Sequence, residues 1–223
     1  MNPWVLLDQT EVPGDGGTMK LFQRAFEFSI SVKNEELMNS RMHGSEDALA
    51  ELTCKKVAGR KNPRVLIGGL GMGFTLGTAL KHLDTTAEVI VAELVPAVVQ
   101  WNRTHLAELA GRPMDDPRVI VREADVGLVI KKQAAAYDAI MLDVDNGPDG
   151  LTHADNNRLY THRGLAAAKA ALRPNGILAI WSAEPDKGFS KRLRGSGFCM
   201  QEITVRARTT KGRRHTIWLA EKK

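Results

Sequence analysis

The chain of 223 residues, 43% of them hydrophobic and 26% charged, is long enough to bury the core of one domain, which excludes a disordered tail and a disulfide-stapled miniprotein. No apolar run approaches the roughly 20 residues of a membrane helix, no leader pattern opens the chain and the two cysteines stand far apart, so we expect a cytoplasmic protein without a membrane span or structural metal. The net charge of +5 divides into +9 from Lys187 onward and −4 before it, which indicates a solvated basic edge more than a nucleic-acid partner.

Residues 1–43 are expected to form a small N-terminal β extension, and residues 44–223 a larger domain. Within the extension, Phe26–Val32 (FEFSISV) is rich in β-forming residues and predicts a short strand or hairpin. Ser45 then has the position of an N-cap for a helix with the sequence SEDALAELTCKKVAG, and Gly59 lies near the end of that helix.

From Arg64 onward, short apolar runs alternate with amphipathic stretches. Strands are predicted at Arg64–Ile67, Glu88–Ala92, Arg118–Val121, Ala139–Leu142 and Ile177–Trp181, and helices at Phe74–His82, Val95–Leu109, Val126–Lys132 and Thr161–Leu172. Uninterrupted Val/Ile/Leu strands separated by helices indicate a parallel sheet that is covered on both faces. The predicted fold is therefore α/β and doubly wound.

The end of the chain follows a different pattern. Glu202–Arg206 and His215–Ala220 are β-rich and flank a polar, glycine-containing stretch, which predicts an antiparallel hairpin. Added to the five parallel strands, this hairpin gives a mostly parallel seven-stranded sheet. Dinucleotide-binding enzymes do not usually end in this way.

A glycine-rich turn, VLIGGLGMGFTLGTAL at residues 65–80, is the sharpest local signal. The first predicted strand runs into Gly69, Gly71 and Gly73, and a helix follows. Glycines there let the backbone turn tightly and approach a ligand, while the helix start offers free N–H groups. The pattern departs from the dinucleotide motif GxGxxG because Phe74 stands where the last glycine would be. A turn that merely packs helix on strand is the alternative.

Two acidic residues follow the next two predicted strands. Glu93 ends the second strand, where a carboxylate can accept both hydroxyls of a ribose; a solvated strand-end acid is the alternative. Asp125 follows the third strand, where it can cap the next helix, contact an adenine amino group, or do both. Together with the glycine turn, these acids predict an adenosine pocket.

On these motifs the chain resembles proteins with the class I S-adenosylmethionine-dependent methyltransferase fold, and among them the spermidine synthase family, over roughly residues 20–220. The matching stretches are VLIGGLGMGFTL, VAELVP, READVGLVI, YDAIMLDVDNGPDG and LYTHRGLAAAKAALRPNGILAIWSA. The resemblance implies a Rossmann-like, S-adenosylmethionine-binding catalytic domain over residues 44–223. It also implies that the nucleotide is S-adenosylmethionine or its decarboxylated form.

The chain departs from this family at two positions. The family's glycine loop usually carries an acid, which helps to hold the free amine of decarboxylated S-adenosylmethionine, where this chain has Met72. The family's catalytic loop carries a base, an aspartate, at the position that aligns with Asn146, and an amide cannot accept a proton. Asp145, one residue earlier, is the candidate base if the loop is shifted.

An acidic loop, DVDNGPDGLTHAD at residues 143–155, follows the fourth strand and should face the reacting end of the nucleotide. Asp143 would hold the amino group of S-adenosylmethionine or the acceptor, Asp145 would serve as base, and His153 is the second candidate base or substrate contact. The acids would attract a cationic acceptor. A surface turn is the alternative, since Gly, Pro and Asp also favour turns.

Three further side chains are candidates for contacts with the substrates. Arg41 could pair with the carboxylate that S-adenosylmethionine keeps and the decarboxylated form lacks. Tyr160 and Trp181 could wall the acceptor site, although aromatic residues at these positions are as often part of a core. No His/Cys spacing supports a metal site.

The sequence thus favours transfer of a methyl group from S-adenosylmethionine to a small, cationic amine. Aminopropyl transfer from decarboxylated S-adenosylmethionine is the alternative, and a nucleotide-binding protein without turnover is a further one. Nucleic-acid methylation rests on the basic C-terminal segment alone. Relatives of the resembled family are commonly dimers, but nothing in the sequence selects a homodimer.

Overall fold

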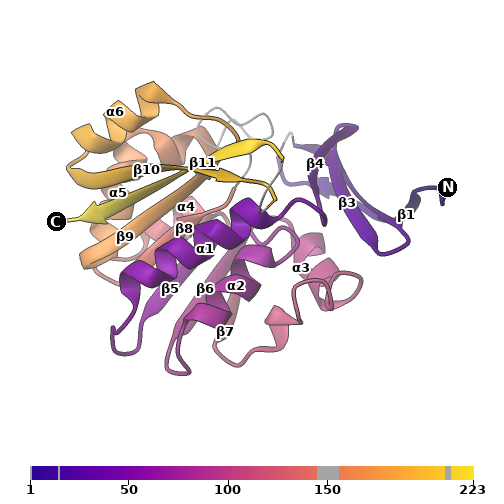
Figure 1. Cartoon of the computed structure of the whole chain (residues 1–223), viewed down its shortest axis with the longest axis horizontal. Helices are drawn as coiled ribbons and strands as arrows, with labels where there is room; N and C mark the ends of the chain where they lie inside the picture. The colour runs from indigo at the N-terminus through magenta and orange to yellow at the C-terminus, as the bar shows by residue number, and fades with distance from the viewer. Residues whose placement is uncertain (1, 15, 145–155, 209–211) are drawn as a thin grey trace.

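The computed structural model describes residues 2–14, 16–144, 156–208 and 212–223. These residues form two β-sheets, and the N- and C-termini lie at opposite ends of the molecule (Figure 1). The seven-stranded sheet has the order β10-β11-β9-β8-β5-β6-β7, and the four-stranded sheet the order β1-β2-β3-β4.

The seven-stranded sheet is parallel in its centre and antiparallel at one edge. Its strands are β5 (Arg64–Gly68), β6 (Glu88–Glu93), β7 (Val119–Glu123), β8 (Tyr137–Leu142), β9 (Leu172–Ser182), β10 (Phe198–Arg206) and β11 (Arg214–Lys222). Strands β5 to β9 pair in parallel, while β11 pairs antiparallel with both β9 and β10. The predicted doubly wound sheet with a terminal hairpin is confirmed.

Helices cover both faces of this sheet because side chains of neighbouring residues in a strand point to opposite faces. The helices are α1 (Gly44–Val57), α2 (Phe74–His82), α3 (Pro96–Arg103), α4 (Val126–Lys131), α5 (His162–Ala171) and α6 (Lys187–Gly195). On β5, Val65 and Ile67 belong to the core under α1, α2 and α3, whereas Leu66 belongs to the core under α4, α5 and α6.

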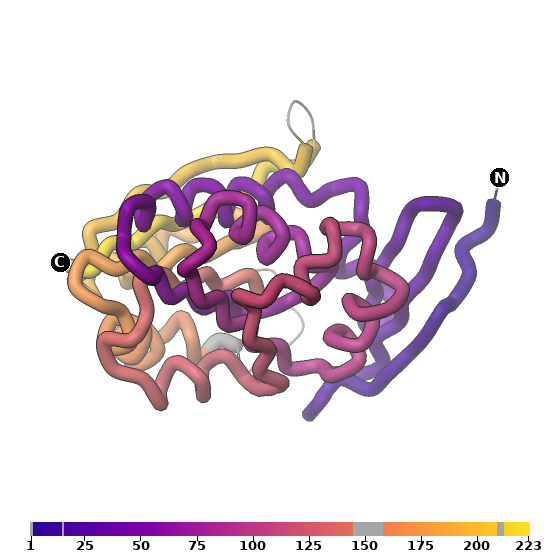
Figure 2. The backbone as a smooth tube through the Cα atoms, turned by 90° about the horizontal axis from the view of Figure 1, so that it is seen from below, coloured from indigo at the N-terminus to yellow at the C-terminus, as the bar shows by residue number. Residues whose placement is uncertain are grey.

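The N-terminal segment is a complete antiparallel sheet, larger than the single strand or hairpin expected. Its strands are β1 (Val5–Val12), β2 (Gly17–Arg24), β3 (Glu27–Val32) and β4 (Glu35–Asn39). Figure 2 shows these strands projecting from one end of the molecule. Leu21 and Ile30 are fully buried and belong to the same core as α1 and α2, so one face of this sheet is covered.

Two local predictions were wrong. The helix expected at Val95–Leu109 ends at Arg103, because Thr104 leaves the helical region with φ −123° and ψ −95°, and turns follow. Leu106 is still buried, which explains why its spacing resembled a longer helix. Ser45 does not cap α1; the N-cap residue is His43, without a side-chain cap, and the Ser45 hydroxyl donates to Glu46 instead.

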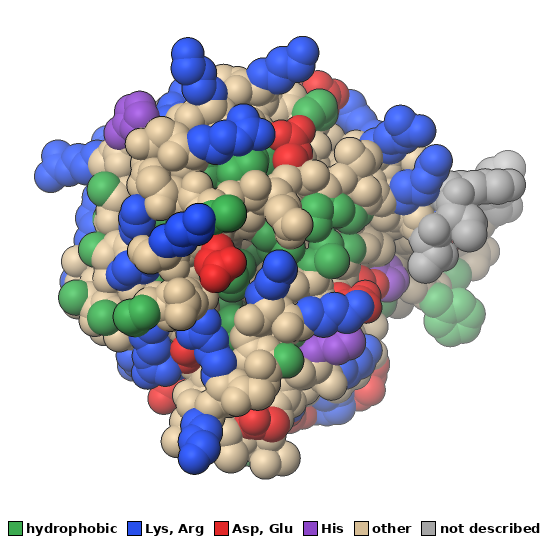
Figure 3. Space-filling model, turned by 60° about the vertical axis from the view of Figure 1, so that its left-hand side comes forward, with side chains coloured by type: hydrophobic (Ala, Val, Ile, Leu, Met, Phe, Trp, Pro, Cys, Tyr) green, Lys and Arg blue, Asp and Glu red, His purple; other side chains and the backbone are tan. Residues whose placement is uncertain are grey.

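Figure 3 brings forward the side of the molecule that carries α6, β10 and the C-terminus, and it shows many Lys and Arg side chains spread among a few acids. On α6, Lys187, Lys191 and Arg194 are exposed. The net positive charge therefore lies on a solvated surface. Within the described part of the chain, no helix is long and apolar enough to cross a membrane.

A buried ion-pair network lies near the start of β8. Asp138 is 3% exposed and accepts hydrogen bonds from Arg60 Nη1 at 2.8 Å and Arg173 Nη1 at 2.6 Å. The backbone N–H of Arg64 donates a third, at 2.8 Å. These bonds tie the loops before β5 and the start of β9 to the middle of the sheet, at the edge opposite the C-terminal ends of the strands.

Candidate functional site

A cavity of about 500 Å³ lies at the C-terminal ends of the parallel strands. Its floor is formed by the segments that follow β5, β6, β7 and β8, and its upper wall by the N-terminal sheet, including Met19, Ile30 and Met38. Ligands of open α/β sheets bind outside the carboxyl ends of the strands, so this cavity has the expected position of a functional site.

The glycine turn after β5 has a conformation that side chains would disturb. Gly69, Gly71 and Gly73 have φ values of +89°, +52° and +83°, which L-residues rarely adopt. A Cβ on Gly69 would collide with the backbone oxygen of Asp143, and one on Gly73 would come within 2.8 Å of Asn102 Oδ1. Asn102 Nδ2 also donates to the Gly71 carbonyl at 2.8 Å, which holds the turn in place.

Glu93, the last residue of β6, points at this turn. Its carboxylate accepts the backbone N–H of Leu70 at 2.8 Å and that of Val95 at 2.8 Å, and the residue is 8% exposed. Burial raises the pKa of Glu93, and the backbone donors oppose that rise. Glu93 also lines the cavity, so its carboxylate lies within reach of the hydroxyl groups of a ligand there.

Asp125 is the N-cap of α4, and its Oδ1 accepts the backbone N–H of Leu128 at 2.9 Å. The capping role that the sequence indicated is therefore confirmed. Asp125 also lines the cavity. Because β6 lies between β5 and β7, Glu93 at the end of β6 stands between the glycine turn and Asp125.

Asp143 and Glu46 line the cavity beside the glycine turn. Asp143 follows β8, and its Oδ2 accepts the hydroxyl of Thr75 at 2.5 Å. Burial raises the pKa of Asp143 to about 6. Burial and, secondarily, the charge of Asp143 raise the pKa of Glu46, in the first turn of α1, to about 7. Two carboxylates in this state hold about one proton between them near pH 6.5.

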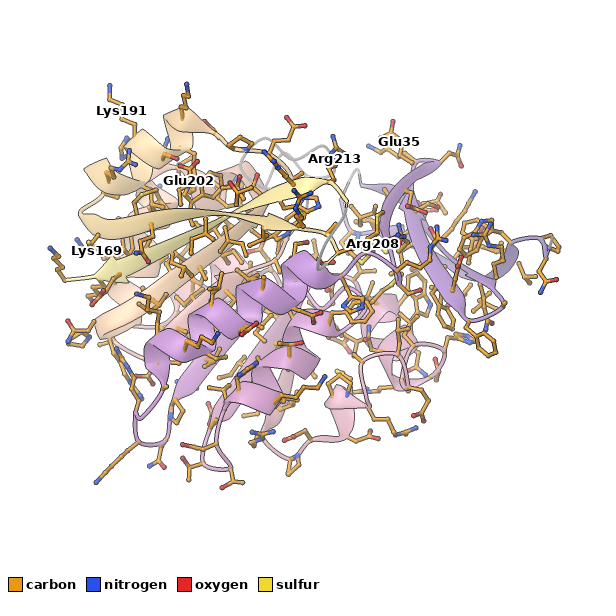
Figure 4. All side chains as sticks on the ribbon, in the orientation of Figure 1. Glu35, Lys169, Lys191, Glu202, Arg208 and Arg213 are labelled. Atoms are coloured by element: carbon orange, nitrogen blue, oxygen red, sulfur yellow. The ribbon has the colours of Figure 1, made fainter. Side chains whose placement is uncertain are left out.

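Trp181 and His215 form the wall of the cavity next to the terminal hairpin. Their rings lie 4.9 Å apart, and Trp181 Nε1 and His215 Nδ1 are buried without a hydrogen-bond partner among the described residues. Burial lowers the pKa of His215, so the ring is neutral at pH 7. Arg213 and Glu35, also lining residues, extend from the two sheets along one edge of the molecule (Figure 4).

Two of the predicted substrate contacts lie elsewhere. Arg41 is not among the residues that line the cavity; its Nη1 pairs with Glu27 Oε1 at 3.2 Å, and its side chain is 54% exposed. Tyr160 is 1% exposed and packs edge-on against Phe189 in the core under α4, α5 and α6. Of the three further side chains predicted to contact the substrates, Arg41, Tyr160 and Trp181, only Trp181 lines the cavity.

Other predicted residues fall outside the described part of the chain. Asp145, Asn146 and His153 lie in residues 145–155, so their roles stay predictions. Met72 lines the cavity and is 3% exposed, so the glycine turn brings no charge to this region. Among the described residues, no group of three or more His, Cys, Asp or Glu side chains could hold a metal ion.

The sequence analysis missed Glu46 and His215, although each carries a readable signal. Glu46 precedes Leu49 and Ala50 by three and four residues, so it lies on the buried stripe of α1. His215 alternates with Ile217 and Leu219, which face the core under α1. The two residues share one signal: each is a polar residue at the end of the buried, apolar face of its helix or strand.

Comparisons with known proteins show which proteins this chain is similar to. Among curated proteins, polyamine aminopropyltransferase 2 of Pseudomonas aeruginosa is 32% identical over 124 residues, covering 54% of this chain and 33% of that protein. Polyamine aminopropyltransferase 1 of Hyperthermus butylicus is 36% identical over 121 residues, covering 52% and 40%. Putrescine N-methyltransferase 4 of Nicotiana tabacum is 34% identical over 127 residues, covering 54% and 31%. The aligned segments thus span less than half the length of each relative.

Among solved structures, spermidine synthase from Thermotoga maritima matches 98% of this chain and 73% of its own, with a TM-score of 0.77 and 19% identity. The CurJ carbon methyltransferase matches 79% of this chain and 54% of its own, with a TM-score of 0.56 and 15% identity. These likenesses support the fold. The family profile of the spermine/spermidine synthase domain matches residues 45–186, from the start of α1 to the end of the β9 loop, and the chain therefore belongs to the spermine/spermidine synthase family.

Proposed function

We propose that this protein transfers an aminopropyl group from decarboxylated S-adenosylmethionine to a small amine such as putrescine. Several of its curated relatives are named polyamine aminopropyltransferases, which supports this reaction over the methyl transfer that the sequence favoured. The amine nitrogen attacks the propyl carbon next to the sulfonium sulfur, the C–N bond forms, and the C–S bond breaks with its electron pair moving to sulfur. The products are 5′-methylthioadenosine, the lengthened amine and one proton.

The observation that carries this proposal is the order of groups along the cavity floor. Asp125 follows β7, Glu93 ends β6, the glycine turn follows β5, and Asp143 follows β8, in the order in which these strands lie in the sheet. In the proposal, Asp125 faces the adenine, Glu93 accepts the ribose hydroxyls, and Asp143 faces the amine-bearing tail. In this proposal, the part of the cavity beside β6 and β7 holds the nucleoside, and the part beside β8 holds the tail.

In such a reaction, the residues of this chain would act mainly by positioning the substrates. The sulfonium carbon is already electrophilic, so the protein has to align the two substrates and exclude water. In the proposal, the N-terminal sheet closes the cavity from above, with Met19, Ile30 and Met38 as apolar wall. Trp181 and the neutral ring of His215 face the acceptor, and His215 can accept a hydrogen bond from its amine.

The test is incubation of the purified chain with putrescine and each nucleotide in turn, followed by mass spectrometry. We expect 5′-methylthioadenosine and spermidine from the decarboxylated nucleotide. Glu93→Gln should lose at least about tenfold in kcat/KM, because one charged acceptor becomes a neutral group that also presents donors. Glu88→Gln at the other end of β6 is the matched control, since Glu88 pairs with Arg64 away from the cavity. Absence of both products would overturn the proposal.

Methyl transfer from S-adenosylmethionine to an amine is the second candidate. It is favoured by Met72, which brings no acid to the glycine turn, and by the likeness to a putrescine N-methyltransferase. The same incubation separates the two, because methyl transfer gives S-adenosylhomocysteine and N-methylputrescine. Those products from S-adenosylmethionine, without 5′-methylthioadenosine from the decarboxylated form, would replace the first proposal by the second.

A further inference from the structure

Glu46 and Asp143 are neighbouring carboxylates that have no cationic partner in the part of the chain that the structure describes. Both line the cavity, and no Lys or Arg side chain of the described residues forms an ion pair with either. Hydroxyl groups hold one oxygen of each: Ser45 Oγ donates to Glu46 Oε2 at 2.6 Å, and Thr75 Oγ1 donates to Asp143 Oδ2 at 2.5 Å. The second oxygen of each accepts no side-chain hydrogen bond within the described chain. An acceptor-rich pair of this kind matches the donors of an ammonium group.

The pair lies where the tail of the nucleotide would reach. Because Gly69 has no Cβ, the backbone oxygen of Asp143 can pack against it, so Asp143 adjoins the turn that follows β5. Glu46 approaches the same region from α1, a different element. Glu93 lies on the β6 side of the turn and Asp143 on its β8 side, so in the proposed binding mode the 5′ end of the nucleoside extends across the turn towards the pair.

The charges around the pair leave it short of a counterion. His43 lies near Glu46, but it is hydrogen-bonded to Asp47 at 2.7 Å. The other charged or titratable groups on the cavity wall are Glu35 and Glu36 of β4, Glu93 and Asp125 on the nucleoside side, and Arg213 and His215 near β11. Acids outnumber cations here, so a carboxylate on the ligand would be repelled and an ammonium attracted.

We propose that Glu46, together with Asp143, is the specificity determinant that binds the ammonium group of the nucleotide tail, rejects the carboxylate of S-adenosylmethionine, and expels its shared proton when the ammonium binds. This rests on the proposed function. Glu46 thus supplies from α1 a charge that the glycine turn, with Met72, does not offer. The ammonium replaces the proton as the partner of both carboxylates, so proton release and selection of the decarboxylated nucleotide have one cause.

Calorimetric titration with three probes tests the inference. 5′-Methylthioadenosine has no tail amine, decarboxylated S-adenosylmethionine has the amine alone, and S-adenosylmethionine has the amine and a carboxylate. For the unmodified chain we expect the decarboxylated form to bind at least about tenfold more tightly than S-adenosylmethionine. Titrations at pH 6.5 in buffers with different ionisation enthalpies should show release of about one proton per decarboxylated nucleotide, falling towards zero at pH 8.5.

Glu46→Gln should bind 5′-methylthioadenosine as the unmodified chain does, but lose most of the preference for the decarboxylated nucleotide and most of the proton release. Glu51→Gln is the matched control on α1, because Glu51 pairs with Lys55 at the surface, at 2.6 Å, and should change neither quantity. A preference and proton release that persist in Glu46→Gln would overturn the inference. Failure of the unmodified chain to bind 5′-methylthioadenosine would overturn the proposed function itself, so the two failures are distinguishable.

Discussion

Strand β8 has an aspartate near each end, and the two have opposite surroundings. Asp138 is held by Arg60, Arg173 and a backbone N–H, so its charge is fully compensated. Asp143, directly after the strand, has the Thr75 hydroxyl and a second carboxylate, Glu46, as neighbours. Asp138 is buried and Asp143 is partly buried in the cavity wall, but only Asp138 has partners of opposite charge among the described residues.

The difference separates a group that stabilises the fold from one that is kept for a ligand. Compensating a buried carboxylate with two guanidinium groups makes its removal costly. Leaving carboxylates beside each other without a cation costs stability in the empty protein, but prepares the site for a positively charged group. The two ends of β8 therefore predict opposite responses to the same substitution.

Asp138→Asn should have the largest effect. It removes the charge that pairs with Arg60 and Arg173, and we expect the free energy of unfolding to fall by about 2–3 kcal/mol. Urea denaturation at pH 7 measures the change. Asp115→Asn is the control, since Asp115 pairs with Arg112 on an exposed surface, and it should shift the midpoint little. Equal stability of both variants would contradict the structural role of Asp138.

Asp143→Asn should change the free energy of unfolding in the opposite direction to Asp138→Asn. An amide keeps an oxygen for the Thr75 hydroxyl but removes one of two neighbouring negative charges, so we expect the free energy of unfolding to rise by about 1 kcal/mol at pH 8. Binding of decarboxylated S-adenosylmethionine should weaken at the same time. The same urea titrations measure stability, and calorimetry measures binding. A loss of stability comparable to that of Asp138→Asn would erase the contrast between the two ends.

The pH dependence of stability sharpens the comparison further. The pKa of Glu46 rises from 4.5 to about 7 and that of Asp143 from 3.8 to about 6, so the folded protein binds protons more tightly than the unfolded chain. The resulting stabilisation is fully present below about pH 4 and is lost as the pH rises through 6 and 7.

Glu46→Gln should therefore be more stable than the unmodified chain at pH 8, by an amount on the order of 1 kcal/mol, and lose that advantage at pH 4.5. Thermal melts at the two pH values, without nucleotide, measure the difference. A constant offset between the two proteins would show that Glu46 does not titrate in this range.

Arg41→Ala should have the smallest effect. Because Arg41 and Glu27 form an exposed pair at 3.2 Å, its loss should change the free energy of unfolding by at most about 0.5 kcal/mol. Affinity for S-adenosylmethionine should stay within about twofold, since Arg41 does not line the cavity. A marked loss of affinity would instead support the pairing with the substrate carboxylate that the sequence suggested.

The central sheet could be predicted from the sequence because its strands are uniformly apolar and alternate with helices. The same reasoning identified the N-terminal extension as β structure and located β3, but it missed strands such as GTMKLFQR, which bury only alternate residues and contain charges. It also extended α3 too far, since the apolar spacing of Leu106 and Leu109 continues through turns.

The candidate site could be predicted only where it depends on local motifs. The glycine turn, Glu93 and Asp125 each stand at a strand end and need no knowledge of tertiary contacts. Glu46 and His215 could not be assigned in the same way, because their place in the cavity depends on how α1 and β11 pack against the sheet. Tyr160 shows the reverse: its position at a helix start suggested a substrate contact, but its side chain is buried in the core.

The roof of the cavity comes from a sheet that is separate in hydrogen bonding from the one that forms its floor. Substitutions in β2, β3 and β4 therefore leave the hydrogen bonds of the floor sheet intact, provided that Met38, which lies against Gly71 of the glycine turn, is kept. Under the proposed function, the roof faces the acceptor while the floor holds the nucleoside. Exchange of residues 17–37 between family members is then a direct way to change which amine is accepted.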